Sequence, residues 1–278
     1  MKTVQARLDE ESQAALNQLT RRFDNGLQFI GSYTWSHAID DSTADVFSTY
    51  TTPRRPQNTQ DLRADRSSSA LDHRNRFTLA LVYDMPYFKH SNWFMKNLVG
   101  NWEIAPIYTY QTGTLWTVQS GTDSNLNGDS GPDRGIVNPN GGTPGIGSGT
   151  TGLTNSAGDT VAFLVDNPNA KYVMTPKGAL PTVGRNTEHL RPINDIDVTA
   201  AKRFNFTERV ALEFSARAFN VFNHPQYTGG YLNDVTPNGA TSGNQHNFLI
   251  PNKPIFADPT QAFSSNPRNL VLALKLVF

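Results

Sequence analysis

The residues best suited to bind a ligand lie in one short segment, in which oxygen-bearing side chains occupy alternate positions. They are Asp123, Asn125, Asn127, Asp129 and Asp133, within the sequence DSNLNGDSGPD. Oxygen ligands at alternate positions, with a glycine that permits the sharp turn, are typical of calcium-binding loops. Arg134 occupies the twelfth position, where such loops carry glutamate, and Asp133 could substitute one place earlier. The segment therefore predicts a Ca²⁺ site, and an ordinary Asn/Asp/Gly turn that binds no ion is the alternative.

The other reactive side chains form no catalytic or transition-metal pattern. The six histidines never pair at ligand spacing, and the absence of cysteine excludes disulfides and thiolate metal sites. His37 with Asp40, or Asp72 beside His73, could be combined with the serines at 67–69 in a search for a catalytic triad. No nucleophile motif surrounds these positions, so we expect no enzymatic activity.

The elements that would position these residues are strands, most clearly in the last eleven residues, RNLVLALKLVF. One face of this segment carries Leu270, Leu272, Leu274, Leu276 and Phe278. Strict alternation indicates a strand, and crossing a bilayer takes about 9–11 residues. We expect the leucine face to contact lipid and Lys275 to face the interior, whereas a soluble sheet with a leucine-lined core is the alternative.

The same alternation recurs along the chain and predicts seven strands in all. They begin with residues 19–23 and 27–36, which flank the hairpin signal Asp24-Asn25-Gly26. The others are expected over residues 76–84, 102–111, 196–204, 210–222 and 268–278. Pro106 lacks a ladder donor, so its strand should bulge there or lie at an edge.

The connections between these strands alternate in length. Short turns alternate with long polar stretches at about 39–73, 113–191 and 223–267. Soluble β-proteins rarely need several such loops, whereas outer-membrane barrels combine short periplasmic turns with long extracellular loops. This pattern orients the final strand with its end in the periplasm and the long loops outside the cell.

The predicted fold class is all-β: a portion of an antiparallel transmembrane β-barrel, about seven strands, forming an open curved sheet in isolation. Bacterial barrels have even strand numbers, so seven strands are most simply the C-terminal part of a larger barrel, over residues 15–278. Residues 1–14 carry mixed strand and helix signals and no apolar signal-peptide core, and they remain unassigned.

Composition agrees with this assignment. With 24 basic and 24 acidic residues the net charge is zero, so no global field favours nucleic acid. No apolar run approaches the roughly 20 residues of a membrane helix.

Five segments in the same order resemble the C-terminal third of TonB-dependent receptors, closest to the Oar-like receptors with a carboxypeptidase-regulatory-like domain common in Acidobacteria. The segments are NGLQFIGSYTWSHAIDDS (25–42), LDHRNRFTLALVYDMPY (71–87), GNWEIAPIYTYQTGTLWTV (100–118), GRNTEHLRPINDIDVTAAKRF (184–204) and ERVALEFSARAFNVFNHPQY (208–227). The chain also ends on the terminal phenylalanine of that family, Phe278.

The resemblance implies a Gram-negative outer-membrane location and a barrel of about 22 strands in the whole receptor. Such receptors contain a plug domain and a TonB box, and they import large nutrients with inner-membrane energy. Plug, box and most strands lie outside this chain, so we expect transport to belong to a full-length parent. The implied partners are outer-membrane lipid, the barrel assembly machinery through Phe278, TonB through the missing parts, and an unidentified ligand.

A second interpretation comes from a different class of protein. A secreted or surface β-rich binding module, stabilised by calcium and holding a ligand in its long loops, would share the strand pattern. Purification separates the two interpretations, since a soluble module would fold without detergent.

Overall fold

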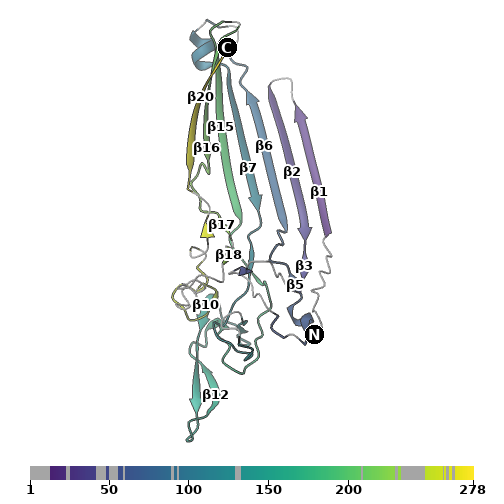
Figure 1. Ribbon diagram of the computed structural model, residues 1–278, viewed down its shortest axis with the longest axis vertical. Helices are drawn as coiled ribbons and strands as arrows, with labels where there is room; N and C mark the ends of the chain where they lie inside the picture. Colours follow the sequence, from purple (N-terminus) through teal and green to yellow (C-terminus); the bar gives the residue numbers. More distant parts are fainter. Residues whose placement is uncertain are drawn as a thin grey trace.

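A large open antiparallel sheet dominates the computed structural model (Figure 1). The structure describes residues 13–22, 26–41, 48–49, 56–58, 60–88, 91–92, 94–128, 133–207, 209–228, 231–232, 248–258, 260, 263–264 and 267–278. The sheet contains β1 (Gln13–Arg22), β2 (Leu27–His37), β6 (Asn75–Asp84), β7 (Trp102–Gln111), β15 (Ile193–Asn205), β16 (Ala211–Phe219) and β20 (Asn269–Val277). These seven strands lie side by side in chain order, every pair antiparallel, which confirms the predicted fold class.

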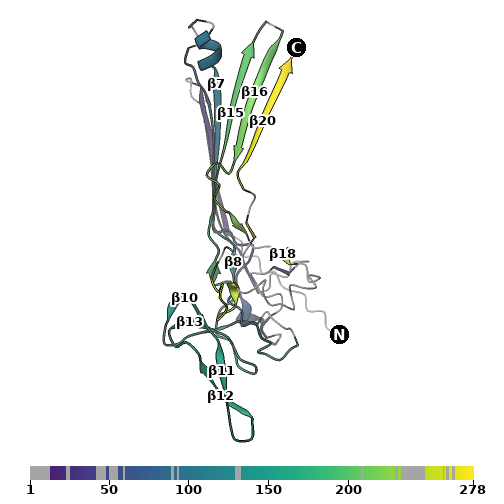
Figure 2. The ribbon, with the colours of Figure 1, turned by 90° about the vertical axis from the view of Figure 1, so that its left-hand side faces the viewer.

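The sheet is curved and does not close (Figure 2). Within the described residues, β1 pairs only with β2 and β20 pairs only with β16. The arrowheads of β1 in Figure 1 and β20 in Figure 2 point to the same end of the sheet. Both edges therefore present strands that run in the same direction.

The connections separate to the two ends of the sheet. Residues 23–26, 85–101 and 206–210 join neighbouring strands at what we call the turn end, where the chain also ends. The described residues of the segments 38–74, 112–192 and 220–268 gather at the opposite, loop end (Figure 1). The predicted alternation of short and long connections is thus present in three dimensions.

Cross-strand register sorts the side chains onto two faces. Residues of the apolar face include Phe29, Tyr33, Trp35, Phe77, Leu79, Leu81, Ile104, Tyr108, Tyr110, Ile196, Val198, Leu212, Phe214, Leu270, Leu272, Leu274 and Leu276. The polar face includes Gln28, Ser32, Thr34, Thr78, Glu103, Thr109, Asp197, Thr199, Arg203, Glu213, Arg217 and Lys275. The apolar face is open to its surroundings: Leu272 is 71% exposed.

Pro106 corrects one expectation from the sequence. It lies in β7, a central strand, rather than at an edge, and the register of β7 against β6 is the same on both sides of it. The paired positions between β6 and β7 are interrupted opposite Ala105 and Pro106, while pairing of Pro106 with Val198 on β15 is intact. A bulge is unnecessary because the missing donor costs only a local gap in one ladder.

The hydrophobic core lies away from the main sheet, at the loop end. Trp116, Val118, Tyr172, Val183, Leu190, Phe248 and Leu249 form one buried cluster, with Phe256 packed against it. We call the described residues of the three long segments the loop body. The composition of these segments predicted polar loops, and the structure shows that they have a hydrophobic core of their own.

Small elements build the loop body. The strands are β3 (Ile39–Asp40), β4 (Ser48–Thr49), β5 (Ser67–Ser68), β8 (Leu115–Trp116), β9 (Ile136–Val137), β10 (Thr143–Ser148), β11 (Thr150–Thr154), β12 (Thr160–Val165), β13 (Ala170–Val173), β14 (Glu188–His189), β17 (Tyr227–Thr228), β18 (Tyr231–Leu232) and β19 (Phe263–Ser264). A 3₁₀ helix, η1, spans Leu62–Asp65, and the hairpin β11–β12 projects beyond the rest (Figure 1). A π-helix, η2 (Met95–Val99), lies at the turn end instead. No helix in the described part of the chain is long and apolar enough to cross a membrane.

Candidate functional site

The segment predicted to bind calcium folds as a turn closed by its own side chains. The Asp123 carboxylate accepts hydrogen bonds from the backbone N–H of Asn127 at 3.0 Å and of Gly128 at 2.9 Å. The Asn125 side-chain oxygen also accepts from the Asn127 N–H, at 3.1 Å. Gly128 has a positive φ of 83°, a conformation that glycine adopts without strain. These oxygens therefore already have donors within the loop.

Asp133 is buried and binds the first residues of that turn. Its Oδ2 accepts hydrogen bonds from the Ser124 hydroxyl at 2.9 Å and from the Asn125 N–H at 2.9 Å. Its Oδ1 accepts from the Gln57 side chain at 3.1 Å. Asp129 lies outside the described residues, and the described ones contain no group of three or more His, Asp or Glu side chains able to hold a metal ion. Calcium binding by Asp123, Asn125, Asn127, Asp129 and Asp133 remains a prediction.

Titration with millimolar CaCl₂ in a calorimeter tests this prediction directly. We expect weak binding that disappears in the variant Asp123→Asn, because loss of one carboxylate lowers the ligand charge of the loop. Asp159, whose carboxylate accepts a hydrogen bond from the Asn155 side-chain amide in another exposed turn, provides the matched control Asp159→Asn. An absence of heat in the unaltered chain would identify residues 123–133 as an ordinary turn.

His37 and Ser68 come together in the structure. The His37 Nε2 lies 3.2 Å from the Ser68 hydroxyl. The neighbouring carboxylates are engaged elsewhere, since Asp40 pairs with Arg185 and Asp72 pairs with Arg74 at 3.2 Å. A histidine activates a serine when a third group orients it. This pair has no such orienting carboxylate in the described structure, so the absence of catalysis stays our prediction.

Arg185 is the central contact of the loop body. Its guanidinium pairs with the Asp40 carboxylate and also donates to the Asp40 carbonyl oxygen at 2.6 Å and the Asp65 carbonyl oxygen at 2.7 Å. Arg185 is only 3% exposed. It thereby joins the second long segment to two positions of the first. Breaking a buried pair of this kind costs far more than breaking a surface pair.

A second buried pair lies beside the first. Arg134 Nη2 is 3.3 Å from Asp65 Oδ1, and Arg134 Nη1 donates to the Ala64 carbonyl at 3.2 Å. Burial raises the pKa of the Asp65 carboxyl, which the positive charge of Arg134 partly offsets. Burial also lowers the pKa of Arg134. Arg134 Nε is buried without a hydrogen-bond partner, so the local packing leaves this cation incompletely satisfied.

Gln57 connects the Arg134–Asp65 pair to the segment predicted to bind calcium. Its backbone N–H donates to Asp65 at 3.0 Å, its side-chain oxygen accepts from the Arg134 N–H at 3.1 Å, and its side-chain amide donates to Asp133. Asn186 extends the network, donating to the Thr117 hydroxyl at 2.8 Å and to the Ser68 carbonyl at 2.8 Å. The loop body is therefore a cross-linked unit rather than three independent loops.

Sequence reasoning missed this network. Arg185 and Asp40 are separated by 145 positions, and Arg185 and Asp65 by 120. No local spacing rule connects residues so far apart. The one available signal was Arg185 within the segment GRNTEHLRP, which carried the family resemblance without a role for this residue.

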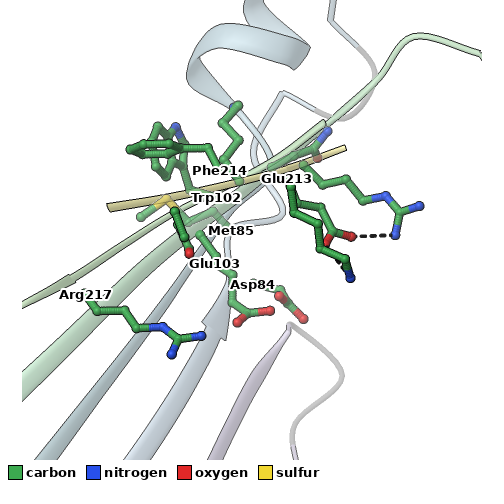
Figure 3. Close-up of a pocket in the computed structure, with 14 residues that line it drawn as sticks. Asp84, Met85, Trp102, Glu103, Glu213, Phe214 and Arg217 are labelled. Atoms are coloured by element: carbon green, nitrogen blue, oxygen red, sulfur yellow. Dashed lines mark ion pairs between the residues drawn. The ribbon is translucent and has the colours of Figure 1, made fainter. Parts of the chain in front are cut away.

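A pocket of about 750 Å³ opens on the polar face near the turn end (Figure 3). Within this pocket the Glu213 carboxylate forms two ion pairs. Its oxygens lie 3.2 Å from the Arg203 guanidinium and 3.7 Å from the Lys275 ammonium group. Asp84 and Glu103 are cross-strand neighbours, and their carboxylates lie side by side in Figure 3. Within the described structure Asp84, Glu103 and Arg217 form no ion pair. The pocket is thus lined by charges that can meet a further polar partner.

Comparison with known protein families gives one match. Residues 3–269 match the outer membrane beta barrel domain. The chain belongs to this family. No match was found among curated proteins or among solved structures.

Membership in the outer membrane beta barrel domain family explains the exposed apolar face, since barrel exteriors contact lipid. Aromatic rings lie near both ends of this face in the barrel domain. Tyr33 and Trp35 are near the loop end, while Trp102 and Phe214 stack edge-to-face at the turn end with ring centroids 6.4 Å apart. Two such bands are the expected boundaries of a membrane-spanning zone.

Lys202 is an exception on the apolar face of this barrel domain, and it is buried. Its ammonium group lies 5.1 Å from the Trp102 ring centroid and 5.4 Å from that of Phe204. It also donates a hydrogen bond to the Gly100 carbonyl oxygen at the turn end. Aromatic faces and a carbonyl thus accommodate a cation that lipid would otherwise exclude.

Proposed function

We propose that this barrel domain is the C-terminal part of a TonB-dependent receptor of the Oar-like subgroup. In the whole receptor it would contribute to energy-coupled uptake of a large nutrient across the Gram-negative outer membrane. The observation that carries the proposal is the cross-linked loop body at one end of a sheet with a charged polar face. Ligand-binding loops held by a rigid scaffold are the usual arrangement of a binding surface.

We place the loop body outside the cell and the turn end in the periplasm. Outer-membrane barrels combine long extracellular loops with short periplasmic turns, and the loop end and turn end differ in this way. The unpaired charges of Asp84, Glu103 and Arg217 on the polar face suit contact with the plug domain that the resemblance implies. The TonB contact itself would lie in parts of the receptor beyond this chain.

The decisive test is the genomic DNA upstream of residue 1. We expect it to continue in frame into a plug domain and a TonB box. Upstream DNA with a stop codon and no such domain would contradict the receptor assignment, while leaving the membership in the barrel family unaffected.

A purification test addresses the alternative of a secreted or surface ligand-binding module. The exposed leucine row of β20 favours the membrane assignment, because a soluble module would cover such a face. We expect the chain to require detergent or lipid for solubility. A folded monomer in detergent-free buffer would favour the soluble module.

Phe278 provides a further prediction. The resemblance implies that the barrel assembly machinery recognises the last strand through this residue, which is 93% exposed. Deleting Phe278 from the receptor should lower its outer-membrane level several-fold, whereas Phe278→Trp, which keeps an aromatic side chain, should have little effect. The measurement is quantitative immunoblotting of outer-membrane fractions. Equal levels of the deletion variant and the unaltered protein would refute a role for the terminal aromatic residue.

A further inference from the structure

The turn between β6 and β7 differs in composition from its two neighbours at the turn end. Residues 85–101 read MPYFKHSNWFMKNLVGN, with four aromatic residues, two lysines and no acidic residue. The other two turns, 23–26 and 206–210, read FDNG and FTERV and each contain an acidic side chain. The 85–101 turn is also the longest of the three and carries η2 (Figure 1).

Large apolar side chains of this turn are exposed. Phe94 is 58% exposed, and Tyr87, Phe88 and Val99 are exposed as well. Phe88 has a φ of 65°, a left-handed conformation that a bulky side chain rarely adopts. Such strain persists only where the surrounding structure imposes it. The fold thus holds an aromatic side chain outward in spite of the backbone cost.

Two contacts hold the turn against the apolar face of the sheet. The Tyr83 hydroxyl donates to the Tyr87 hydroxyl at 3.3 Å, and Tyr83 lies on the apolar face. Lys202, also on that face, donates to the carbonyl oxygen of Gly100, which ends η2. Both ends of the turn are therefore attached to the lipid-facing surface, beyond the ends of the strands.

Charge completes the pattern. Lys96 is exposed within η2, two residues after Phe94. Within the apolar face itself, Lys202 is buried by aromatic rings and a carbonyl. Exposed aromatic and aliphatic side chains with a nearby lysine are typical of segments that lie in the membrane interface.

We propose that residues 85–101 form an interfacial anchor that binds phospholipid headgroups at the turn end of the barrel. Phe94 and Val99 enter the boundary between headgroups and acyl chains, and Lys96 contacts headgroup phosphates. Lys202 and Tyr83 keep the anchor against the lipid-facing surface. This inference rests on the membrane location of the family and is independent of the proposed uptake function.

The absence of cysteine allows single labels to test the anchor in the complete 278-residue chain. Phe94→Cys carries an environment-sensitive fluorophore, and Leu180→Cys, an 83% exposed apolar position of the loop body, is the matched control. The chain is reconstituted in vesicles of phosphatidylcholine with phosphatidylglycerol. We expect spin-labelled lipid to quench the label at position 94 and aqueous iodide to quench the label at position 180. Val99→Cys repeats the test if the Phe94 variant fails to fold.

A charge variant tests the headgroup contact. Lys96→Gln should lower the ratio of lipid quenching to iodide quenching at position 94 about fivefold in vesicles with phosphatidylglycerol. In vesicles of phosphatidylcholine alone the same variant should have little effect. Lys177→Gln, which removes an exposed lysine from the loop body, should leave the ratio at position 94 unchanged in both kinds of vesicle.

The outcomes separate the parts of the proposal. Iodide quenching at positions 94 and 99 equal to that at position 180 would overturn the anchor. Lipid quenching that is insensitive to Lys96→Gln in both vesicles would overturn the headgroup contact. Neither result bears on TonB-dependent uptake, which the upstream DNA tests separately.

Discussion

Replacing Arg185 with methionine should release the loop body while leaving the main sheet folded. Methionine keeps much of the side-chain length but removes the cation that pairs with Asp40 and donates to two carbonyl oxygens. Breaking a buried pair on one side costs about 3–5 kcal/mol. Backbone amide exchange near Asn186 and Ser69 should therefore accelerate by about two to four orders of magnitude, since about 1.4 kcal/mol corresponds to tenfold. Hydrogen–deuterium exchange in detergent measures this effect.

Two further variants provide controls for Arg185→Met. Arg203→Met removes a pair with Glu213 whose side chains are much more exposed, and such pairs contribute about 1 kcal/mol or less. The double variant Arg185→Met/Asp40→Leu replaces both buried charges and should recover much of the lost protection. Exchange in Arg185→Met no faster than in Arg203→Met would show that the buried pair does not hold the loop body.

Leu274→Arg should destabilise the barrel domain by about 2–4 kcal/mol when the position lies near mid-membrane. Leu274 is on the apolar face, opposite Phe214 on β16, and nothing in the described structure covers it. An arginine there must carry its charge into hydrocarbon or distort the lipid around it. Denaturant unfolding of the chain in lipid vesicles measures the loss.

Ala273→Arg is the matched control, one residue away on the polar face. Ala273 lines the pocket that contains Glu213, so a new arginine at this position meets water and an acidic neighbour. Lys275→Gln, on the same face, should likewise have little effect. Similar losses for Leu274→Arg and Ala273→Arg would mean that the two faces are wrongly assigned.

The main sheet was predictable because each strand carries its signal locally. Alternation of period two in β2 and β20 identifies the strand and sorts its side chains in one step. The Asp24-Asn25-Gly26 signal predicted the first turn, and Gly26 has a positive φ of 78°, a conformation that glycine adopts without strain. The pairing register between neighbouring strands follows from the same alternation, because a shift by one residue would exchange the apolar and polar faces.

The loop body was not predictable in the same way. Its core residues, such as Trp116 and Leu249, are too widely spaced in the sequence to show a period. The buried pairs of Arg134 and Arg185 depend on contacts between segments that only the folded chain brings together. In the hairpin β11–β12, residues 160–165 read TVAFLV, a short apolar run without alternation inside a Gly- and Thr-rich segment. Calcium binding at residues 123–133 is still open to experiment.

The common direction of β1 and β20 restricts what can complete the barrel. In a closed antiparallel barrel the strands alternate in direction, so a sheet added here must begin and end with strands that run toward the loop end. Such a sheet has an odd number of strands. A second copy of this chain in the same membrane orientation also supplies an odd number, but its edge strands run toward the turn end, so both seams would be parallel. Antiparallel closure therefore requires a sheet whose two edge strands run toward the loop end. A second copy of this chain does not provide such a sheet.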